Sequence, residues 1–516
     1  MATRTTGADA LVRFLPVAAL LLLASLAFAH LMSLPVFEDE GSQLRLIWRI
    51  VEAGEWWQPL IDGKPLEAWP MIGLLHFRMP LEAIRALHVV VGIAGVLLTY
   101  RLGLELGSRS CAFIAAALFS VCPFAVYLQR LALADVLLST AGVGVLLATL
   151  SVIRCTSAGR GAVLAGSLLL AALCKLPVGF IFVLALPLAL ILMPATMRSD
   201  LMRASRARLI APQAPVWLLA LGVAGIAALR VARGQVPGFG LQDLFGIGAG
   251  RYQDIAAIIG IARPGLLTEL AAQLSWPVVV LGILGVAAAL VSPDWRARWL
   301  AATGLLPMLT IGLAAHFWYP RYLLFTLPPL TVAGVYGWHG VLPRFQAFAR
   351  PIGAALIALC AALMGRQAAL LITDPAAAHW SPVDRFQYVE GWGSGYGYPE
   401  AAEYLMRAAA ARRVYALDGH SAYQLRAYLP ADWGERVATI FYGRDGRPLT
   451  SAEARVDELR RDAPVWILIA PQLLHQYLDS SFGTGNAARI RVTQVAVFDK
   501  PGTRAQLAIY DAAWRE

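Results

Sequence analysis

Charged residues are scarce in this sequence. Of its 516 residues only 15% are Asp, Glu, Lys or Arg and 58% are hydrophobic, whereas a typical soluble chain has roughly 25% charged and 45–50% apolar residues. The mean hydropathy is +0.62. This composition excludes an ordinary soluble enzyme, because long stretches have no aqueous surface to present. We therefore expect lipid to surround much of the chain.

Cysteine, metal-binding and nucleotide-binding patterns are also sparse. The five cysteines lie in or beside apolar segments and form no Cys-x-x-Cys pair, which argues against a disulfide framework or a thiolate metal site. No His/Cys cluster has zinc spacing, so we expect no bound zinc. No Gly-x-x-x-x-Gly-Lys-Ser/Thr loop is present, and the glycines of residues 391–397 follow no expected strand. An enzyme built on this chain would draw its activated group from something other than a soluble nucleotide.

Apolar stretches of membrane-spanning length fill the first 372 residues. Stretches of roughly 17–25 residues predict about eleven transmembrane helices, to within one or two, and the fifth and sixth are close enough to form a re-entrant pair instead. With a cytoplasmic N-terminus, arginines fall on the cytoplasmic side at five successive connections, as the positive-inside rule requires. The net charge of +10 thus indicates topology and anionic lipid rather than nucleic acid. The expected spans are 11–34, 83–106, 111–129, 136–153, 161–174, 177–195, 215–232, 271–291, 299–315, 322–339 and 351–372.

Two segments of the chain are predicted to lie outside the membrane on the outer side. The first outer loop, residues 35–82, contains apolar residues at helical spacing, which predicts an amphipathic helix on the membrane surface. After residue 373 charges return, and β-rich runs alternate with helical stretches at 399–412 and 451–461. We expect a membrane domain over 1–372 and a soluble extracytoplasmic α/β domain over 373–516. The apolar residues of the loop are Leu44, Ile47, Trp48 and Val51, and the β-rich runs are 413–417, 465–469 and 506–510.

Acids gather where the expected helices leave the membrane on that outer side. Asp39 and Glu40 follow the first span directly, and Asp135 follows the third. An acid just outside a span costs little free energy, because water can solvate it. A carboxylate at this edge can also act as a general base beside a lipid-borne reactant. Arg130 lies close enough in sequence to Asp135 for a structural ion pair, which is an equally good interpretation.

Cations occupy the same outer side, which the positive-inside rule leaves poor in positive charge. Lys64 precedes a proline in the first outer loop, and Lys175 lies alone at the tip of an apolar helical hairpin. Each can be an interfacial lysine that extends to head groups or a ligand for a phosphate. The last outer turn places Arg321 among His316, Tyr319 and Tyr322, where the aromatic residues are explained by a membrane-interface belt but the arginine is not.

The order of these motifs resembles that of the GT-C membrane glycosyltransferases, in the branch that includes the protein O-mannosyltransferases and the lipid A aminoarabinose transferase. The resemblance covers roughly residues 11–340, and its motifs are short. The resemblance rests on the order of these motifs along the chain and on the side of the membrane where they are expected. The matching motifs are Asp39-Glu40, Gly63-Lys64-Pro65-Leu66, Arg85, Pro123 with Arg130 and Asp135, Lys175-Leu176-Pro177, Pro320-Arg321-Tyr322-Leu323 and Leu327-Pro328-Pro329-Leu330.

The resemblance implies an inverting transfer of a hexosyl or pentosyl group from a polyprenyl-phosphate carrier, such as undecaprenyl or decaprenyl phosphate, to a protein, lipid or glycan acceptor. Asp39 would then activate the acceptor, with Glu40 beside it, and Asp135 would help to position acceptor or sugar. The cations would bind the carrier phosphate, and a divalent cation is an open possibility. The phosphate ligands would be Lys64, Arg130, Lys175 and Arg321, with His316, Tyr319 and Tyr322 lining the pocket.

The chain departs from the family pattern after the acidic pair, where Gly41-Ser42-Gln43 replaces the usual Ala-Arg-Tyr, and after Lys64, where a second proline is missing. Two other functions remain open, a polytopic transporter and a non-catalytic glycolipid-binding protein. Composition and resemblance together indicate a bacterial inner membrane. We expect the aromatic residues Trp392, Tyr396 and Tyr398 to dock the soluble domain on the membrane part, with sugar stacking on Trp392 as the alternative.

Overall fold

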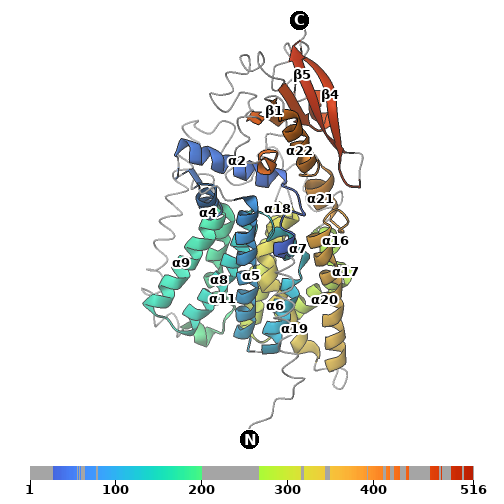
Figure 1. The fold of residues 1–516 in the computed structure, drawn as a ribbon. Coiled ribbons are helices and arrows are strands. Elements are labelled where there is room, and N and C mark those ends of the chain that lie inside the picture. The colour runs from blue at the N-terminus through green and yellow to red at the C-terminus, as the bar shows by residue number, and fades with distance from the viewer. Residues whose placement is uncertain are drawn as a thin grey trace, which may run out of the picture. The chain divides into compact units, whose positions relative to one another are not determined.

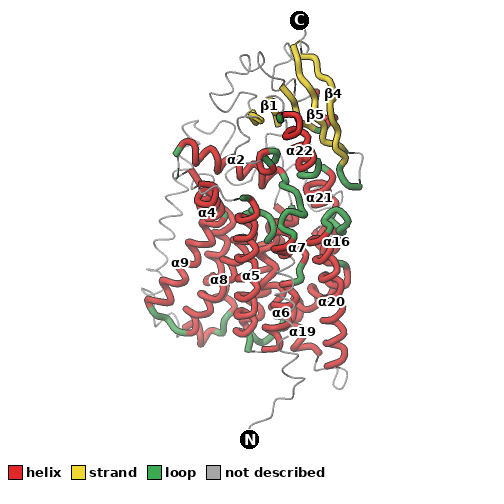
Figure 2. The backbone as a smooth tube through the Cα atoms, in the orientation of Figure 1, coloured by secondary structure: helices red, strands yellow, loops and turns green. Residues whose placement is uncertain are grey.

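The chain forms two compact units, which we call the helical unit and the sheet unit after their content (Figures 1 and 2). The helical unit comprises Met1–Leu31, Glu55–Pro70 and Ala83–Thr373, and the sheet unit comprises Met32–Gly54, Met71–Glu82 and Asp374–Glu516. The first outer loop is therefore shared between the two units. The computed structural model describes residues 27–54, 56, 58–59, 64–76, 80–107, 109–199, 266–314, 319–342, 349–391, 393–410, 414–418, 424–429, 437–440, 465–475, 478, 490–502 and 505–514.

Long apolar helices dominate the helical unit. Three helices of the described residues are long and apolar enough to cross a membrane, namely α5 (Leu81–Glu105), α8 (Ala134–Arg154) and Pro351–Thr373 of α20 (Ala349–Thr373). They confirm the expected spans 83–106, 136–153 and 351–372. The pair α16 (Leu266–Leu274) and α17 (Trp276–Leu290) also qualifies as one span, but it is bent by 117°. Most of 11–34 and all of 215–232 lie outside the described residues, so the total of eleven stays a prediction.

Two other expected spans are interrupted. The expected span 111–129 is divided before Pro123, which lacks an N–H for the helix ladder, and the expected span 177–195 is interrupted by a 3-10 turn at Phe180–Leu184. The remaining elements of this unit are α4 (Pro65–His76), α6 (Arg109–Ser120), α7 (Pro123–Leu128), α9 (Ala158–Cys174), α10 (Leu176–Gly179), η1 (Phe180–Leu184), α11 (Ala185–Leu192), α18 (Trp295–Ala314), η4 (Pro320–Thr326) and α19 (Leu327–Val341).

Small residues bring α17 and α19 into backbone contact. A Cβ atom built on Gly337 would lie 1.9 Å from the carbonyl oxygen of Gly285. Such close approach is the means by which helices pack in lipid, where apolar side chains gain nothing by leaving the surrounding hydrocarbon. The main core of the unit lies between α8, α9, α11, α18 and α19, where the buried Trp299 donates a hydrogen bond to Ala185 O at 2.8 Å.

The sheet unit contains a five-stranded sheet in the order β2-β1-β3-β5-β4. β1 (Val414–Asp418) runs parallel to β2 (Val437–Ile440) and β3 (Val465–Ile469), whereas β5 (Gln506–Trp514) is antiparallel to β3 and to β4 (Ile490–Asp499). Helix α22 (Tyr398–Ala409) packs on one face and a second apolar cluster covers the other. The three predicted β-rich runs and the helix at 399–412 are confirmed, β2 and β4 were missed, and 451–461 lies outside the described residues.

The N-terminal part of the sheet unit is the amphipathic helix predicted in the first outer loop. Helix α2 (Glu38–Ala53) opens with three acids, which the partial positive charge of a helix N-terminus favours. It ends at Gly54, whose φ of 68° is readily accessible only to glycine. Leu44, Ile47 and Ile50 are buried and form its apolar face.

Candidate active site

A cluster of charges gathers at one end of the helical unit, which we call the cluster end. Asp135 lies in the first turn of α8, and Lys175 is the residue that follows α9. Arg321 lies in η4, just before α19, and Lys64 lies just before α4. Lys175, Arg321 and Lys64 all lie within electrostatic reach of Asp135. We call these four residues and Glu67 the cationic cluster.

Lys175 is the centre of this cluster. The chain leaves α9 in an extended conformation at Lys175, with φ −159° and ψ 92°, so the side chain is free of the helix surface. Its Nζ atom lies 3.1 Å from Asp135 Oδ1 and 4.5 Å from the centre of the Tyr322 ring. Within the described part of the chain, one of its three N–H donors is used by Asp135 and the side chain stays 17% exposed. The ammonium is thus held in place with donors left for an anion.

Arg321 is held by two aromatic rings. Its guanidinium carbon lies 4.9 Å from the ring centre of Tyr319 and 5.4 Å from that of Tyr322. The two rings meet edge to face, with centres 5.6 Å apart. Cation–π contacts of this kind hold a charge in place without neutralising it. Arg321, Tyr319 and Tyr322 therefore lie together as predicted, while His316 falls outside the described residues.

Lys64 caps the N-terminus of α4. Its carbonyl oxygen accepts hydrogen bonds from the N–H groups of Glu67 and Ala68, and Pro65 takes the first helical position, where its missing N–H costs nothing. A lysine at a helix N-terminus opposes the helix dipole, at a cost of about 0.3–1 kcal/mol.

Glu67 is a residue of the site that sequence reasoning missed. It is completely buried, and its Oε2 atom lies 3.7 Å from Lys64 Nζ. Burial raises the pKa of the Glu67 carboxyl, Asp135 adds to the rise, and Lys64 and Lys175 oppose it. The three-residue spacing from Lys64 along the start of a helix was the signal that could have found it. Since burial favours its neutral form, Glu67 offsets less of the charge of Lys64 and Lys175 than an exposed carboxylate would.

Arg130 has a different position from the one predicted. It is fully buried, and its guanidinium donates hydrogen bonds to the carbonyl oxygens of Leu371 and His30. The expected pair with Asp135 is therefore corrected, since Asp135 pairs with Lys175. Arg85 of the family motif is likewise buried and donates to Leu31 O at 2.7 Å. Both arginines connect backbone segments of the helical unit, so we leave Arg130 out of the phosphate site.

The acidic turn formed by Glu38, Asp39 and Glu40 belongs to the sheet unit. Glu40 is completely buried, whereas Asp39 is partly exposed at the start of α2. That Asp39 shares one pocket with Lys64 and Asp135 stays a prediction. In the described residues no three His, Cys, Asp or Glu side chains are grouped so that they could hold a metal ion.

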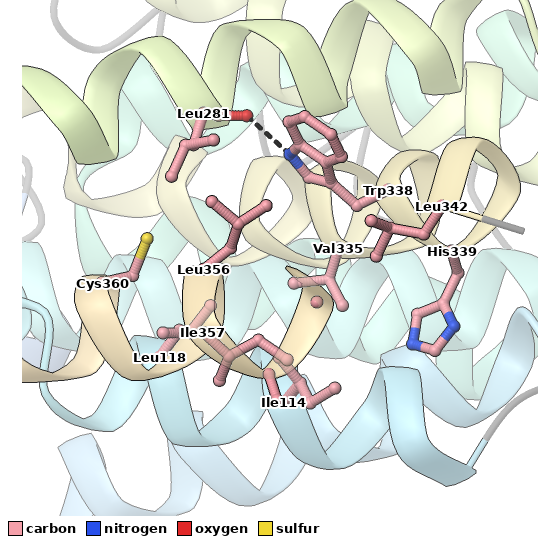
Figure 3. Close-up of a pocket in the computed structure, with 12 residues that line it drawn as sticks. Ile114, Leu118, Leu281, Val335, Trp338, His339, Leu342, Leu356, Ile357 and Cys360 are labelled. Atoms are coloured by element: carbon pink, nitrogen blue, oxygen red, sulfur yellow. Dashed lines mark hydrogen bonds between the residues drawn. The ribbon is translucent and has the colours of Figure 1, made fainter. Parts of the chain in front are cut away.

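An apolar cavity of about 390 Å³ lies in the half of the helical unit away from the cationic cluster. Its lining comes from α6, α17, α19 and α20, with Trp338 donating a hydrogen bond to Leu281 O at 2.9 Å (Figure 3). His339 and Cys360 are the titratable groups in that lining. The cavity has neither the charges nor the paired acids and bases of the cationic cluster, which is why we treat the cluster as the candidate site.

Comparison with solved structures fixes the fold. ArnT from Cupriavidus metallidurans, solved with bound undecaprenyl phosphate, superposes with a TM-score of 0.60 over 98% of both chains at 14% identity. Its apo form gives a TM-score of 0.58 at 13% identity, again over 98% of both chains. This chain has the GT-C fold.

A second GT-C protein, the Archaeoglobus fulgidus oligosaccharyltransferase, matches with a TM-score of 0.53 at 11% identity, over 95% of this chain and 75% of its own. No protein-family model matches the sequence, and no curated protein matches it. A GT-C chain is a polytopic helical membrane protein with a C-terminal domain, which confirms the fold class predicted from the sequence.

Proposed function

We propose that this protein transfers a sugar from a polyprenyl-phosphate carrier to an acceptor, with inversion at the anomeric carbon. The observation that carries the proposal is the cationic cluster: Lys64, Lys175 and Arg321 gather around Asp135 at one end of a membrane-spanning unit. A lipid phosphate is the anion that such a place selects, because its charge sits at the membrane edge and its tail stays in lipid. Two solved GT-C structures hold such lipids, undecaprenyl phosphate in ArnT and dolichol phosphate in the archaeal enzyme AglB.

The chemistry follows from the leaving group. When the bond between the anomeric carbon and the phosphate oxygen breaks, the electron pair stays on the polyprenyl phosphate, and the neighbouring cations stabilise that growing charge. Asp39 is the proposed general base: its carboxylate takes the proton of the acceptor hydroxyl as that oxygen bonds to the anomeric carbon. One base and no covalent intermediate suffice for inversion, by analogy with inverting glycosidases.

The remaining features of the proposal concern partners and place. The acceptor is a protein, a lipid or a glycan on the outer face of a bacterial inner membrane, with the sheet unit on the same side. The donor sugar is a hexose or a pentose. A divalent cation that helps to hold the phosphate is part of the same hypothesis, and a chelator distinguishes a metal-dependent transfer from a metal-independent one.

The test is a transfer assay with purified protein in lipid nanodiscs and a panel of undecaprenyl-phosphate sugars. We expect Asp39→Asn to lower turnover at least about 100-fold while binding of undecaprenyl phosphate persists, because a base acts on the chemical step. We expect Lys64→Met to weaken that binding.

Other outcomes would point elsewhere. Full turnover in Asp39→Asn would remove the base assignment. Binding of the carrier by the wild-type protein without consumption of any donor would favour a non-catalytic glycolipid-binding protein. Movement of intact donor across proteoliposomes would favour a transporter.

A further inference from the structure

The segment that precedes Asp39 is held by hydrogen bonds from residues far along the chain. The N–H of Glu38 donates to Gly393 O at 2.9 Å, and the N–H of Val36 donates to the Tyr428 hydroxyl at 2.7 Å. The amide of Gln424 donates to both Val36 O, at 2.8 Å, and Gly393 O, at 3.0 Å. All these residues belong to the sheet unit. The backbone on the N-terminal side of Asp39 is therefore fixed by partners from the C-terminal part of the chain.

The loop Gly391–Gly397 approaches this segment so closely that side chains would not fit. A Cβ atom on Gly395 would lie 2.2 Å from the carbonyl oxygen of Val36, and one on Gly393 would lie 3.1 Å from Glu38 Oε2. A contact under 3 Å with backbone cannot be relieved by a rotamer change. Gly395 is therefore needed for the close approach rather than for flexibility, whereas at Gly393 a small shift of the Glu38 side chain would make room.

A buried lysine holds the loop in shape. Lys500 follows β4, is 3% exposed, and donates three hydrogen bonds: to Gly391 O at 2.8 Å, to Ser394 O at 3.1 Å and to Ser394 Oγ at 2.9 Å. Burial lowers the pKa of this lysine to about 8. A buried ammonium is costly and is retained where its donors are all used. Here all three donors converge on the loop, so the loop's conformation depends on Lys500.

Aromatic packing adds a second restraint on the acidic turn. Phe37, which caps α2, meets the ring of Tyr388 edge to face with centres 4.9 Å apart. Tyr388 in turn packs against Trp380 at 5.4 Å. Tyr398 is completely buried in the core of the sheet unit. Trp392 lies outside the described residues.

We propose that the loop Gly391–Gly397, clamped by Lys500, is a positioning element that sets the place and direction of the acidic turn from which Asp39 acts. This inference rests on the proposed function, since it gives the sheet unit a part in the transfer reaction. Lys500, Gln424 and Gly395 are positioning residues, and none of them needs to touch substrate. A displacement of a catalytic group by about 1 Å can cost about 100-fold in rate, so the rate is a sensitive readout of the clamp.

The decisive variant is Gly395→Ala, because its methyl group would collide with Val36 O. We expect turnover to fall about 10- to 100-fold, while the dissociation constant of undecaprenyl phosphate changes less than twofold. Amide hydrogen exchange should show faster exchange in residues 34–40. The matched control is Gly365→Ala, where nothing lies within 4 Å of the added Cβ; it should match the wild-type protein in all three measurements.

Lys500→Met is the second variant, used if Gly395→Ala does not fold. It should also speed amide exchange in residues 34–40 and lower turnover without weakening carrier binding. A purely structural role would lower turnover and carrier affinity together. Wild-type turnover in a folded variant, or unchanged exchange in residues 34–40, would overturn the inference. A wild-type protein that transfers no sugar would overturn the proposed function instead, and the inference with it.

Discussion

The two ends of the helical unit use the same types of charged residue in different ways. At the cluster end, three cations share Asp135 and a reluctantly ionised Glu67, and two of them rest against tyrosine rings. At the opposite end, Arg296 donates hydrogen bonds to Asp294, from Nε to Oδ1 at 3.1 Å and from Nη2 to Oδ2 at 2.8 Å. Its Nη1 donates to Glu105 O at 2.6 Å. Each donor group of that guanidinium has a partner.

The opposite end is therefore built to hold helices together. Arg154 at the end of α8 pairs with Glu105 at the end of α5, and the Tyr336 hydroxyl of α19 reaches Asp294 Oδ2 at 3.4 Å. Although burial opposes it, hydrogen bonds from Arg296 hold the pKa of Asp294 below its usual value. A paired network of this kind has little left to offer a ligand. The comparison teaches that the way a cation is held distinguishes the two ends: Arg321 lies against tyrosine rings, whereas Arg296 has a hydrogen-bond acceptor for each donor group.

The largest expected effect is that of Lys175→Met on carrier binding. Removing a charge-assisted contact of this kind costs about 2–3 kcal/mol, so undecaprenyl phosphate should bind about 100-fold more weakly. The measurement is a binding isotherm in nanodiscs. Because the substitution also leaves Asp135 buried without its partner, the double variant Lys175→Met/Asp135→Asn serves as the control: it should recover thermal stability but not affinity. Restored affinity in the double variant would show that the loss came from misfolding.

A smaller effect is expected for Arg321→Lys. Lysine keeps the charge but loses the planar group that lies against Tyr319 and Tyr322, so the cation is held less firmly. Carrier affinity should fall about three- to tenfold, measured in the same way. Tyr322→Phe keeps the ring and should stay within about twofold of wild type. Equal losses in both variants would mean that the tyrosine hydroxyl, not the stacking, matters.

Arg296→Met probes the opposite end and should separate stability from binding. It leaves Asp294 without its partner and Glu105 O without a donor, which should lower the free energy of unfolding by about 1–2 kcal/mol, since Arg296 is partly exposed. The melting temperature should fall while carrier affinity stays within about twofold of wild type. A loss of affinity comparable to that of Lys175→Met would break the contrast between the two ends.

Lys500 offers a third use of a cation, buried against neutral acceptors, and its expected effect depends on pH. Its pKa in the folded protein, about 8, lies below its ordinary value of 10.5. Between these two pH values the unfolded chain keeps a proton that the folded chain has lost, so this residue makes stability rise with pH by at most about 3 kcal/mol. The melting temperature should therefore rise less, or fall more steeply, between pH 7.5 and 10 in Lys500→Met than in the wild-type protein. Parallel curves would mean that Lys500 keeps its proton.

Sequence reasoning found what depends on local pattern and missed what depends on distant partners. β1 and β3 were found because continuous apolar runs indicate buried strands, whereas β4 is mostly exposed or half-buried and contains polar residues such as Thr493 and Gln494, so it gives no such signal. The spans α5, α8 and α20 were found from length and apolar composition.

The site shows the same division. The threading predicted Asp135, Lys175 and Arg321 on one side of the membrane, and the structure brings these three residues together. The role of Arg130 was not predictable, because its acceptor in α20 lies 241 residues further along the chain. Lys500 was missed because a lysine after a strand is usually solvated, and only the folded loop shows its three acceptors.

The discontinuity of the sheet unit has a consequence for biosynthesis. Residues 32–54 are made early, yet Gln424, Tyr428 and the loop Gly391–Gly397, which contact these residues, emerge only after α20. The early segment must wait for its counterpart to arrive. A truncated product that stops after Thr373 would keep its membrane helices and leave the acidic turn unanchored. Conversely, a fragment that starts at Asp374 would leave Gln424, Tyr428 and Tyr388 without their contacts to Val36 and Phe37, and should express well only when that short peptide is supplied with it.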